Sequence, residues 1–152
     1  MPPRPASIPA NLGFAQLLRA RGLRPTAQRR AIYSVFARAA GADASNAHLD
    51  GEEVFEQARV HLPELSRGTA YNALGELVEA GLIGVVEGPG PRRYDANVSA
   101  HHHFRCALCG ELRDIALDQI DVTLLQEGFE VEQAHVLLEG LCPRCAVGAG
   151  AA

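Results

Sequence analysis

The sequence predicts an α+β protein in which an amino-terminal winged helix-turn-helix precedes a carboxy-terminal α/β domain that holds a four-cysteine site. Helical spacing of apolar residues dominates residues 14–80, and short alternating stretches typical of strands follow from residue 82 onward. Two CxxC pairs lie in the last third of the chain. We expect the winged helix over residues 1–94, a hinge over 95–100 and the second domain over 101–152.

Four helices are expected in the first domain. Thr26, Asp50 and Ser66 are residues that cap helix amino termini, and each directly precedes a stretch with apolar residues at helical spacing. Gly22 and Gly81 follow two of these stretches and terminate them, as glycine commonly does. The predicted helices cover residues 14–21, 27–39, 51–61 and 67–80.

A hairpin after the fourth helix completes the winged-helix pattern. The stretches LIGVVE and RRYD flank Gly-Pro-Gly-Pro, which is typical of two short strands around a tight connection. The first two turns of the fourth helix would enter a DNA major groove, where guanidinium and amide groups reach phosphates or base edges. Alternatively, Tyr71 belongs to the core, and the arginines only form the solvent-exposed face of a helix. The candidate DNA-contacting residues are Arg24, Arg67, Thr69, Tyr71, Asn72, Arg92 and Arg93.

The net charge of −4 conceals an uneven distribution. Residues 1–38 contain seven arginines and no acidic residue, whereas residues 96–152 contain three arginines and eight acidic residues. Attraction to phosphate explains the basic end, and bound cations would neutralise part of the acidic end. All fourteen basic residues are arginine, so a compositional preference also contributes to the arginine content.

Strand alternation separates two candidate metal sites in the second domain. In a strand over 101–106, His101 and His103 share one face, while Cys106 lies on the other face. A second strand over 112–117 contains Asp114, a helix with apolar residues between 122 and 129 follows, and a last strand leads to the second CxxC pair. Such a domain leaves an exposed sheet edge and apolar surface, which favours a homodimer.

The CxxC pairs, Cys106/Cys109 and Cys142/Cys145, favour a structural Zn(II) site. Each pair presents two thiolates to one side of a metal ion, and two pairs complete a tetrahedral sulfur shell. Two disulfides or a redox-active CxxC are the alternatives. The first residues lack the apolar core of a secretory signal, and no stretch reaches the roughly 18 apolar residues of a membrane span. We therefore expect a cytoplasmic protein with no membrane partner, where thiols favour metal binding over disulfides.

Six separated motifs extend over nearly the whole chain: RGLRPTAQRRAIYSVF, HLDGEEVF, TAYNALGELVEAGLI, RRYD, HHHFRCALCGELRDI and CPRC. In this order they resemble the ferric uptake regulator family of metal-dependent bacterial repressors. The resemblance implies a homodimer that binds double-stranded operator DNA through a winged helix and is not an enzyme. It also implies a carboxy-terminal dimerisation domain, a structural four-cysteine zinc and a regulatory metal at the hinge.

The resemblance further implies a set of ligands for the regulatory metal: His48, Asp95, His101, His103 and Asp114. Five nitrogen and oxygen ligands without a thiolate suit Fe(II) or Mn(II). Taken singly, residues of this set also have ordinary roles that involve no metal. His48 near a helix start is usually a surface or capping residue, and Asp114 has Arg105 and Arg113 as possible ion-pair partners.

Aspartate at positions 95 and 114 resembles the peroxide-sensing branch of the family (PerR-like), because iron-sensing members commonly have glutamate there. TAYNAL also looks closer to that branch than to the widespread TVYRTL. The resemblance then implies that hydrogen peroxide is sensed through iron-catalysed oxidation of a ligand histidine, here His48 or His101, followed by DNA release. The alternative is an iron- or manganese-responsive uptake repressor without peroxide sensing.

A third metal site, present in some family members, is expected to be incomplete in this chain. It would use His102, Asp121 and two further histidines, and the sequence has Ala100 and Ala134 at those two positions, with His135 adjacent to the second.

Two other classes of protein are also compatible with the histidines, carboxylates and cysteines of this chain. A zinc-dependent hydrolase would need an open coordination position beside a general base, and a redox enzyme would use the CxxC pairs.

Overall fold

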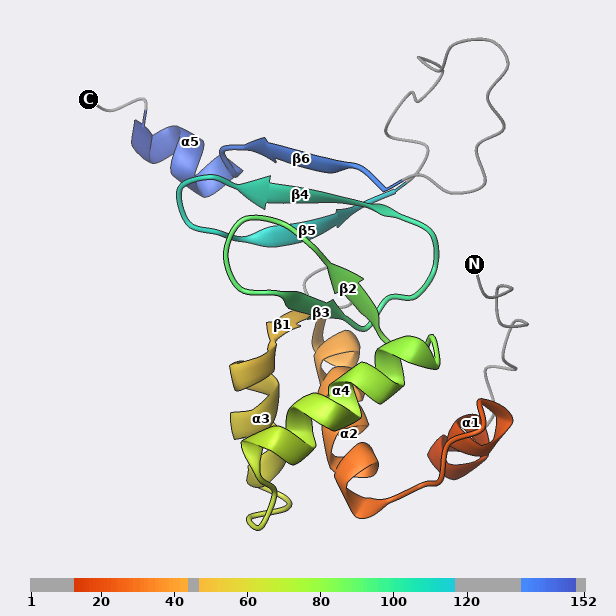
Figure 1. Cartoon of the computed structure of the whole chain (residues 1–152). Coiled ribbons are helices and arrows are strands. Elements are labelled where there is room, and N and C mark those ends of the chain that lie inside the picture. The colour runs from red at the N-terminus through yellow and green to blue at the C-terminus, as the bar shows by residue number, and fades with distance from the viewer. Residues whose placement is uncertain (1–12, 44–46, 117–134, 150–152) are drawn as a thin grey trace, which may run out of the picture. The chain divides into compact units, whose positions relative to one another are not determined.

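The computed structural model describes residues 13–43, 47–116 and 135–149 and consists of two compact units, Met1–Val98 and Ser99–Ala152. Each unit contains its own three-stranded sheet (Figure 1). The boundary between the units falls inside the stretch 95–100, where the sequence predicts a hinge. Within the described residues, no helix is both long and apolar enough to cross a membrane.

The described part of the first unit contains four helices, and three of them begin at the capping residues that the sequence indicates. The side chains of Asp50 and Ser66 each accept a hydrogen bond from the backbone N–H three residues further on. The hydroxyl of Thr26 accepts one in the same way, at 3.3 Å. The helices are α1 (Phe14–Ala20), α2 (Ala27–Asp43), α3 (Gly51–Arg59) and α4 (Arg67–Glu79).

Helix α2 is longer than predicted, since it continues to Asp43 instead of ending near Ala39. The Ala-Gly-Ala that intervenes contains no residue that forces a stop, because one glycine costs a helix only about 1 kcal/mol. The apolar stripes predicted from the spacing are buried, and α2, α3 and α4 pack on one another through them. Fully buried residues of this core are Ile32, Val35, Phe36, Val54, Leu74 and Leu77.

A small sheet with the strand order β1-β3-β2 completes the first unit. Strands β2 (Gly84–Val86) and β3 (Arg93–Asp95) form the predicted hairpin, with Val85 opposite Tyr94. Strand β1 (His48–Asp50) was not predicted, because three residues are too few to show an alternating pattern. It exists through its pairing with β3. Helices followed by this hairpin confirm the predicted winged helix-turn-helix.

The second unit contains a mixed sheet with the order β5-β4-β6. The central strand β4 (His102–Cys106) pairs antiparallel with β5 (Leu112–Ile115) and parallel with β6 (Leu137–Gly140). Helix α5 (Pro143–Ala149) was not predicted; its first residue is a proline, which suits that helix position. The helix predicted between residues 122 and 129 lies outside the described residues.

Candidate metal centres and nucleic-acid interface

The four cysteines of the second unit converge because of the strand directions. Strands β4 and β6 are parallel, with Cys106 opposite Gly140, so their carboxyl ends lie at the same edge of the sheet. Cys106 is the last residue of β4, and Cys142 follows β6 by two residues. Each strand end therefore delivers one CxxC pair to the same place. All four sulfur atoms lie within 4.8 Å of one another.

This sulfur geometry fits a tetrahedral zinc site. Four sulfur atoms bound at about 2.3 Å to one ion lie roughly 3.8 Å apart, and the Sγ atoms of Cys109 and Cys142 are 3.8 Å apart. A disulfide would require a distance of about 2.05 Å. Backbone N–H groups of Cys109 and Cys142 point at Cys106 and lower the pKa of its thiol to about 6, which favours the thiolate form that binds metal.

Two charged residues near the cysteines, Glu111 and Arg144, support this cluster through hydrogen bonds and were not among the predicted site residues. Arg144 lies between the two cysteines of the second CxxC pair and donates to Glu111 at 2.8 Å. The backbone carbonyl of Glu111 accepts a hydrogen bond from the N–H of Cys106, also at 2.8 Å. Hydrogen bonds from Arg144 and Arg113 lower the pKa of Glu111 to about 2, so its carboxylate is charged at neutral pH. The available sequence signal was a charged residue close to each CxxC pair: Glu111 two residues after Cys109, and Arg144 inside the second pair.

A second group of candidate metal-binding side chains lies on the sheet of the second unit and directly before its strand β4. His103 on β4 is directly opposite Asp114 on β5. The Nε2 atoms of His101 and His103 are 2.9 Å apart, and Asp114 Oδ1 lies 3.4 Å from the first and 3.8 Å from the second. These three residues are the C-terminal ligand group. The alternative partners of Asp114 are engaged elsewhere, since Arg105 pairs with Glu139 and Arg113 with Glu111.

The orientation of His101 favours metal binding by the C-terminal ligand group. Its Nδ1 lies 2.8 Å from the backbone carbonyl oxygen of Ser99, which can only accept a hydrogen bond. The neutral ring therefore carries its proton on Nδ1 and directs the Nε2 lone pair toward His103 and Asp114. Two nitrogen ligands at about 2.1 Å from one ion, at a right angle, would be about 3.0 Å apart. The observed nitrogen separation matches this value.

The first unit contains the other two predicted ligands, His48 and Asp95, here termed the N-terminal ligand group. They lie opposite each other on β1 and β3, with His48 Nε2 3.7 Å from Asp95 Oδ2. The second carboxylate oxygen of Asp95 accepts a hydrogen bond from the Asn97 backbone N–H at 2.7 Å. Both side chains are buried, so a surface role for His48 is wrong, and its capping role is wrong because Asp50 caps α3. The sequence places Asp95 in the predicted hinge over residues 95–100. In the structure it is instead the last residue of strand β3.

The residue considered for a third metal site has a structural role. His102 is buried at 1% exposure, and its Nδ1 accepts a hydrogen bond from the Val136 backbone N–H at 3.3 Å. This bond ties β4 to the segment that leads into β6. Positions 121 and 134, which the third site would need, lie outside the described residues.

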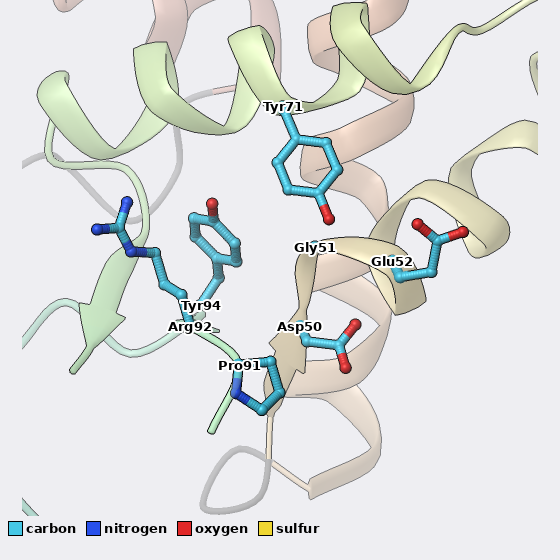
Figure 2. A pocket seen from close by; sticks show the side chains of 7 residues that line it. All are labelled: Asp50, Gly51, Glu52, Tyr71, Pro91, Arg92 and Tyr94. Carbon is cyan, nitrogen blue, oxygen red and sulfur yellow. The ribbon is translucent and has the colours of Figure 1, made fainter. Parts of the chain in front are cut away.

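The predicted DNA-contacting side chains lie on the surface of the first unit. Tyr71 is 45% exposed, so its alternative assignment to the core is wrong. Its ring lies against Gly51, where an added Cβ would be 2.5 Å from a ring carbon. Figure 2 shows this tyrosine over the start of α3, beside a cavity of about 350 Å³. The other exposed members of the predicted set are Arg24, Arg67, Thr69, Asn72 and Arg92; Arg93 is half-buried.

Several arginines of the basic amino-terminal part have roles within the fold. Arg29 donates to Glu76 from Nε at 2.8 Å and to the carbonyl of Arg24 at 2.7 Å. Arg21 donates to the carbonyl of Ala80, the residue that follows α4. The charge of Arg29 is therefore compensated by α4. The positive charge that faces solvent is smaller than the arginine count of residues 1–38 suggests.

One chain combines a winged helix-turn-helix with a four-thiol cluster and with two groups of histidine and aspartate ligands. This combination defines a metal-binding protein with a nucleic-acid-binding fold. The chain matches the ferric uptake regulator family over residues 20–138 and belongs to that family. This match confirms the resemblance that the six motifs carry.

Individual relatives support the same assignment. The transcriptional regulator FurA of Mycobacterium tuberculosis is 33% identical over 150 residues, covering 93% of this chain and 94% of FurA. The peroxide-responsive repressor PerR of Staphylococcus epidermidis is 29% identical over 133 residues, covering 84% and 85% of the two chains. The ferric uptake regulator from Francisella tularensis with iron superposes with a TM-score of 0.69 at 20% identity, covering 82% and 96%. That superposition confirms the predicted fold.

Proposed function

We propose that this protein is a metal-dependent repressor that binds operator DNA as a cytoplasmic homodimer and is not an enzyme. The observation that carries the proposal is the division of the histidine and aspartate ligands. His101, His103 and Asp114 converge in the second unit, whereas His48 and Asp95 face each other in the winged-helix unit. A metal ion that takes ligands from both groups restricts how the winged helix is held.

The mechanism is a shift between two states. Metal binding selects the arrangement in which the two recognition helices of a dimer match successive major grooves, and loss of the metal removes this bias. Imidazole and carboxylate ligands without a thiolate favour Fe(II) or Mn(II). Exposed Leu108, Leu138 and Val147 in the second unit are candidate contacts between protomers.

The four-cysteine cluster has a structural role in this proposal. All four thiols come from the second unit, so Zn(II) bound there cross-links β4, β6 and α5 of that unit without involving the winged helix. A closed tetrahedral sulfur shell has no open position for a substrate or a water molecule. This feature argues against a hydrolase at the cysteines.

We further propose that the repressor responds to hydrogen peroxide. Aspartate at both position 95 and position 114, together with the similarity to PerR, supports this function. Fe(II), when bound, would supply the electrons that reduce peroxide, and His48 and His101 are the ligands expected to be oxidised. Oxidation of either imidazole weakens a ligand on one side of the proposed site and releases DNA.

A test of peroxide sensing compares protein loaded with Fe(II) and protein loaded with Mn(II), each exposed to peroxide. Mass spectrometry of peptides containing His48 or His101 should show the gain of one oxygen atom with iron, and no gain with manganese. DNA affinity should fall in parallel. If iron-loaded protein keeps unmodified histidines and full DNA affinity, peroxide sensing is wrong and metal-dependent repression still stands.

The second candidate function is an iron- or manganese-responsive uptake repressor without peroxide sensing. The similarity to the ferric uptake regulation protein 1 of Mycolicibacterium fortuitum, 32% identical over 132 residues against 29% for PerR, favours it. Measurements of DNA binding with Mn(II), Fe(II) and Zn(II), with and without peroxide, separate the two functions. DNA affinity that is the same with and without these metals would contradict both.

A further inference from the structure

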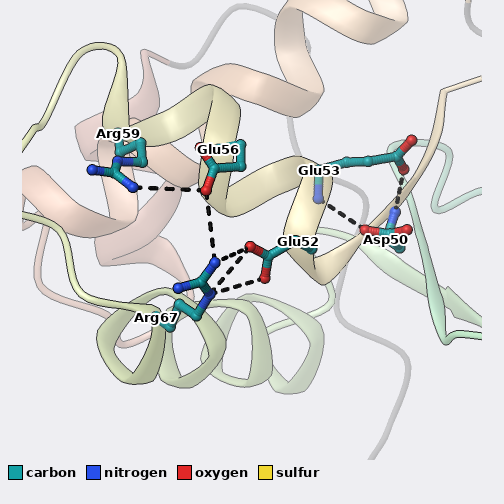
Figure 3. A network of polar contacts seen from close by, with 6 residues as sticks. All are labelled: Asp50, Glu52, Glu53, Glu56, Arg59 and Arg67. Atoms are coloured by element: carbon teal, nitrogen blue, oxygen red, sulfur yellow. Dashed lines mark hydrogen bonds and ion pairs between the residues drawn. The ribbon is translucent and has the colours of Figure 1, made fainter.

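An ion pair at the start of the recognition helix holds one arginine in a defined orientation. Arg67 is the first residue of α4, and Glu52 is the second residue of α3. The Nε atom of Arg67 donates to both carboxylate oxygens of Glu52 at 3.1 Å, and Nη2 donates to Oε1 (Figure 3). The carboxylate thus engages the guanidinium side-on.

The ring of Phe55 lies beneath the same guanidinium, and Arg59 lies over this ring at a longer distance, 5.4 Å. The guanidinium carbon of Arg67 lies 4.9 Å from the ring centroid, and Phe55 is only 4% exposed. A guanidinium over a buried aromatic ring gains a cation–π attraction and has a rigid support. Glu56 lies farther away, 3.8 Å from Nη2, and pairs also with Arg59. Arg67 is therefore oriented by one carboxylate and one ring.

The remaining edge of the guanidinium is chemically suited to reading guanine. A guanidinium offers two bidentate edges, one formed by Nε and Nη2 and the other by Nη1 and Nη2. Glu52 occupies the first edge, and the second is the one that donates end-on to guanine O6 and N7 in a major groove. The Arg67 side chain is 62% exposed, which makes its tip accessible to DNA.

We infer that Glu52 is a specificity-determining positioning residue, which orients Arg67 to recognise a guanine at one position of each half-site. The inference rests on the proposed function, because it requires sequence-specific DNA binding. A free arginine would contact phosphates of any sequence, whereas an arginine held side-on loses fewer rotamers when it binds a base. Glu52 also places a negative charge near the DNA and thereby weakens binding to non-specific sequences.

The test uses the full-length metal-loaded protein and selection from a randomised duplex library. The selected duplex is then compared with duplexes in which each base pair is replaced in turn. The variants are Glu52→Gln, Arg67→Ala and the double variant, with Glu56→Gln as the matched control. Glu56 is on the same helix and its replacement changes the net charge equally, but its contact with Arg67 is longer.

The expected result is a loss of preference at a single guanine. Removing Arg67 should reduce discrimination at that base pair by between about fivefold and about a hundredfold, the range of one good bidentate contact. Glu52→Gln should reduce it at the same base pair and should increase binding to unrelated DNA. Glu56→Gln should keep the base preference. In the Arg67→Ala background, Glu52→Gln should have no further effect on discrimination.

Two results would overturn the inference while leaving the proposed function intact. One is an equal gain of affinity by Glu52→Gln for all sequences, which would make Glu52 a competitor of phosphate only. The other is an unchanged preference in both single variants. If the metal-loaded wild-type protein selects no sequence, the proposed function fails and this inference fails with it.

A measurement without DNA tests the positioning role independently of repression. The Arg67 side-chain N–H signal in an NMR spectrum should be protected from exchange in the wild type and in Glu56→Gln. It should lose this protection in Glu52→Gln, with thermal unfolding confirming that the variant is folded. An unprotected signal in the wild type would contradict the inference whatever the DNA-binding result.

Discussion

The thiol cluster and the histidine–aspartate ligands differ in how the chain distributes them. Cys106, Cys109, Cys142 and Cys145 all belong to the second unit. The histidine and aspartate ligands form the C-terminal ligand group in the second unit and the N-terminal ligand group in the first. An ion bound to ligands of one unit stabilises that unit, whereas an ion that takes ligands from both couples the two. The same chain can therefore use one metal for folding and another for regulation.

The largest expected effect concerns the thiol cluster. Replacement of Cys142, which is 1% exposed and donates its backbone N–H to Cys106 at 3.3 Å, leaves three sulfur ligands around a buried position. Cys142→Ser should lose zinc and unfold the second unit, because structural zinc contributes about 10 kcal/mol or more to the folding of small domains. Metal analysis and circular dichroism measure the two losses. A folded, zinc-free variant would contradict the structural role.

The next effect should leave the fold intact and remove regulation. In His48→Ala, the N-terminal ligand group loses its imidazole, while every cysteine remains. Even residues that only support metal ligands change affinity by about 10–100-fold, so we expect a loss of Mn(II)-dependent DNA affinity of at least tenfold. Zinc content should match the wild type, and circular dichroism should show that the variant is folded. Retained metal dependence would show that the two ligand groups do not share an ion.

A smaller effect tests whether the DNA face is independent of both metal groups. In Gly51→Ala the new methyl group overlaps the ring of Tyr71, which must move away from α3. Overpacking of this kind costs about 1–3 kcal/mol, and DNA affinity should fall because Tyr71 lies on the predicted DNA-contacting surface. Zinc and Mn(II) binding, measured by calorimetry, should be unchanged. Tyr71→Ala in the same background should show no further loss of DNA affinity.

The smallest effect concerns an ion pair of the first unit that involves no metal. The hydrogen bond from Arg29 lowers the pKa of Glu76 below its ordinary value of 4.5. The pair therefore stabilises the folded state above that pH, and this contribution disappears as the pH falls through the lowered pKa. Glu76→Gln should cost roughly 1 kcal/mol at pH 7, since the Glu76 side chain is 41% exposed and solvent weakens the pair. Urea unfolding at pH 7 and pH 3 should show the difference shrinking in acid.

Much of the fold could be predicted because its signals are local. Capping residues at Thr26, Asp50 and Ser66, with apolar residues at helical spacing, mark the starts of three helices. The wing follows from two short stretches, LIGVVE and RRYD, around Gly-Pro-Gly-Pro. Strand β1 could not be predicted, because only its pairing with β3 makes three residues a strand. Helix α5 was missed because it begins inside the CPRC motif, where metal-ligand spacing was the dominant signal.

The residue types of the candidate site could be predicted from the sequence. The strand register that brings these residues together could not. Alternation along β4 predicts that His101 and His103 share a face, and the 2.9 Å separation of their Nε2 atoms agrees with this. The partner of Asp114 was ambiguous in sequence, since Arg105 and Arg113 were nearby alternatives. Strand register decided it, because β5 aligns Asp114 with His103. Register depends on long-range pairing, which local patterns do not specify.

The sequence by itself determined which ligand atoms this protein offers: four thiols in two CxxC pairs, and histidines and aspartates without a thiol. These choices are fixed by residue type, and residue type restricts which metals each site favours. Only the tertiary structure decided which residues meet. The parallel pairing of β4 with β6 brings Cys106 and Cys142 to one edge. The contact between α3 and α4 orients Arg67 through Glu52. Both contacts join residues far apart in the chain, where packing and hydrogen-bond register act and local propensity does not.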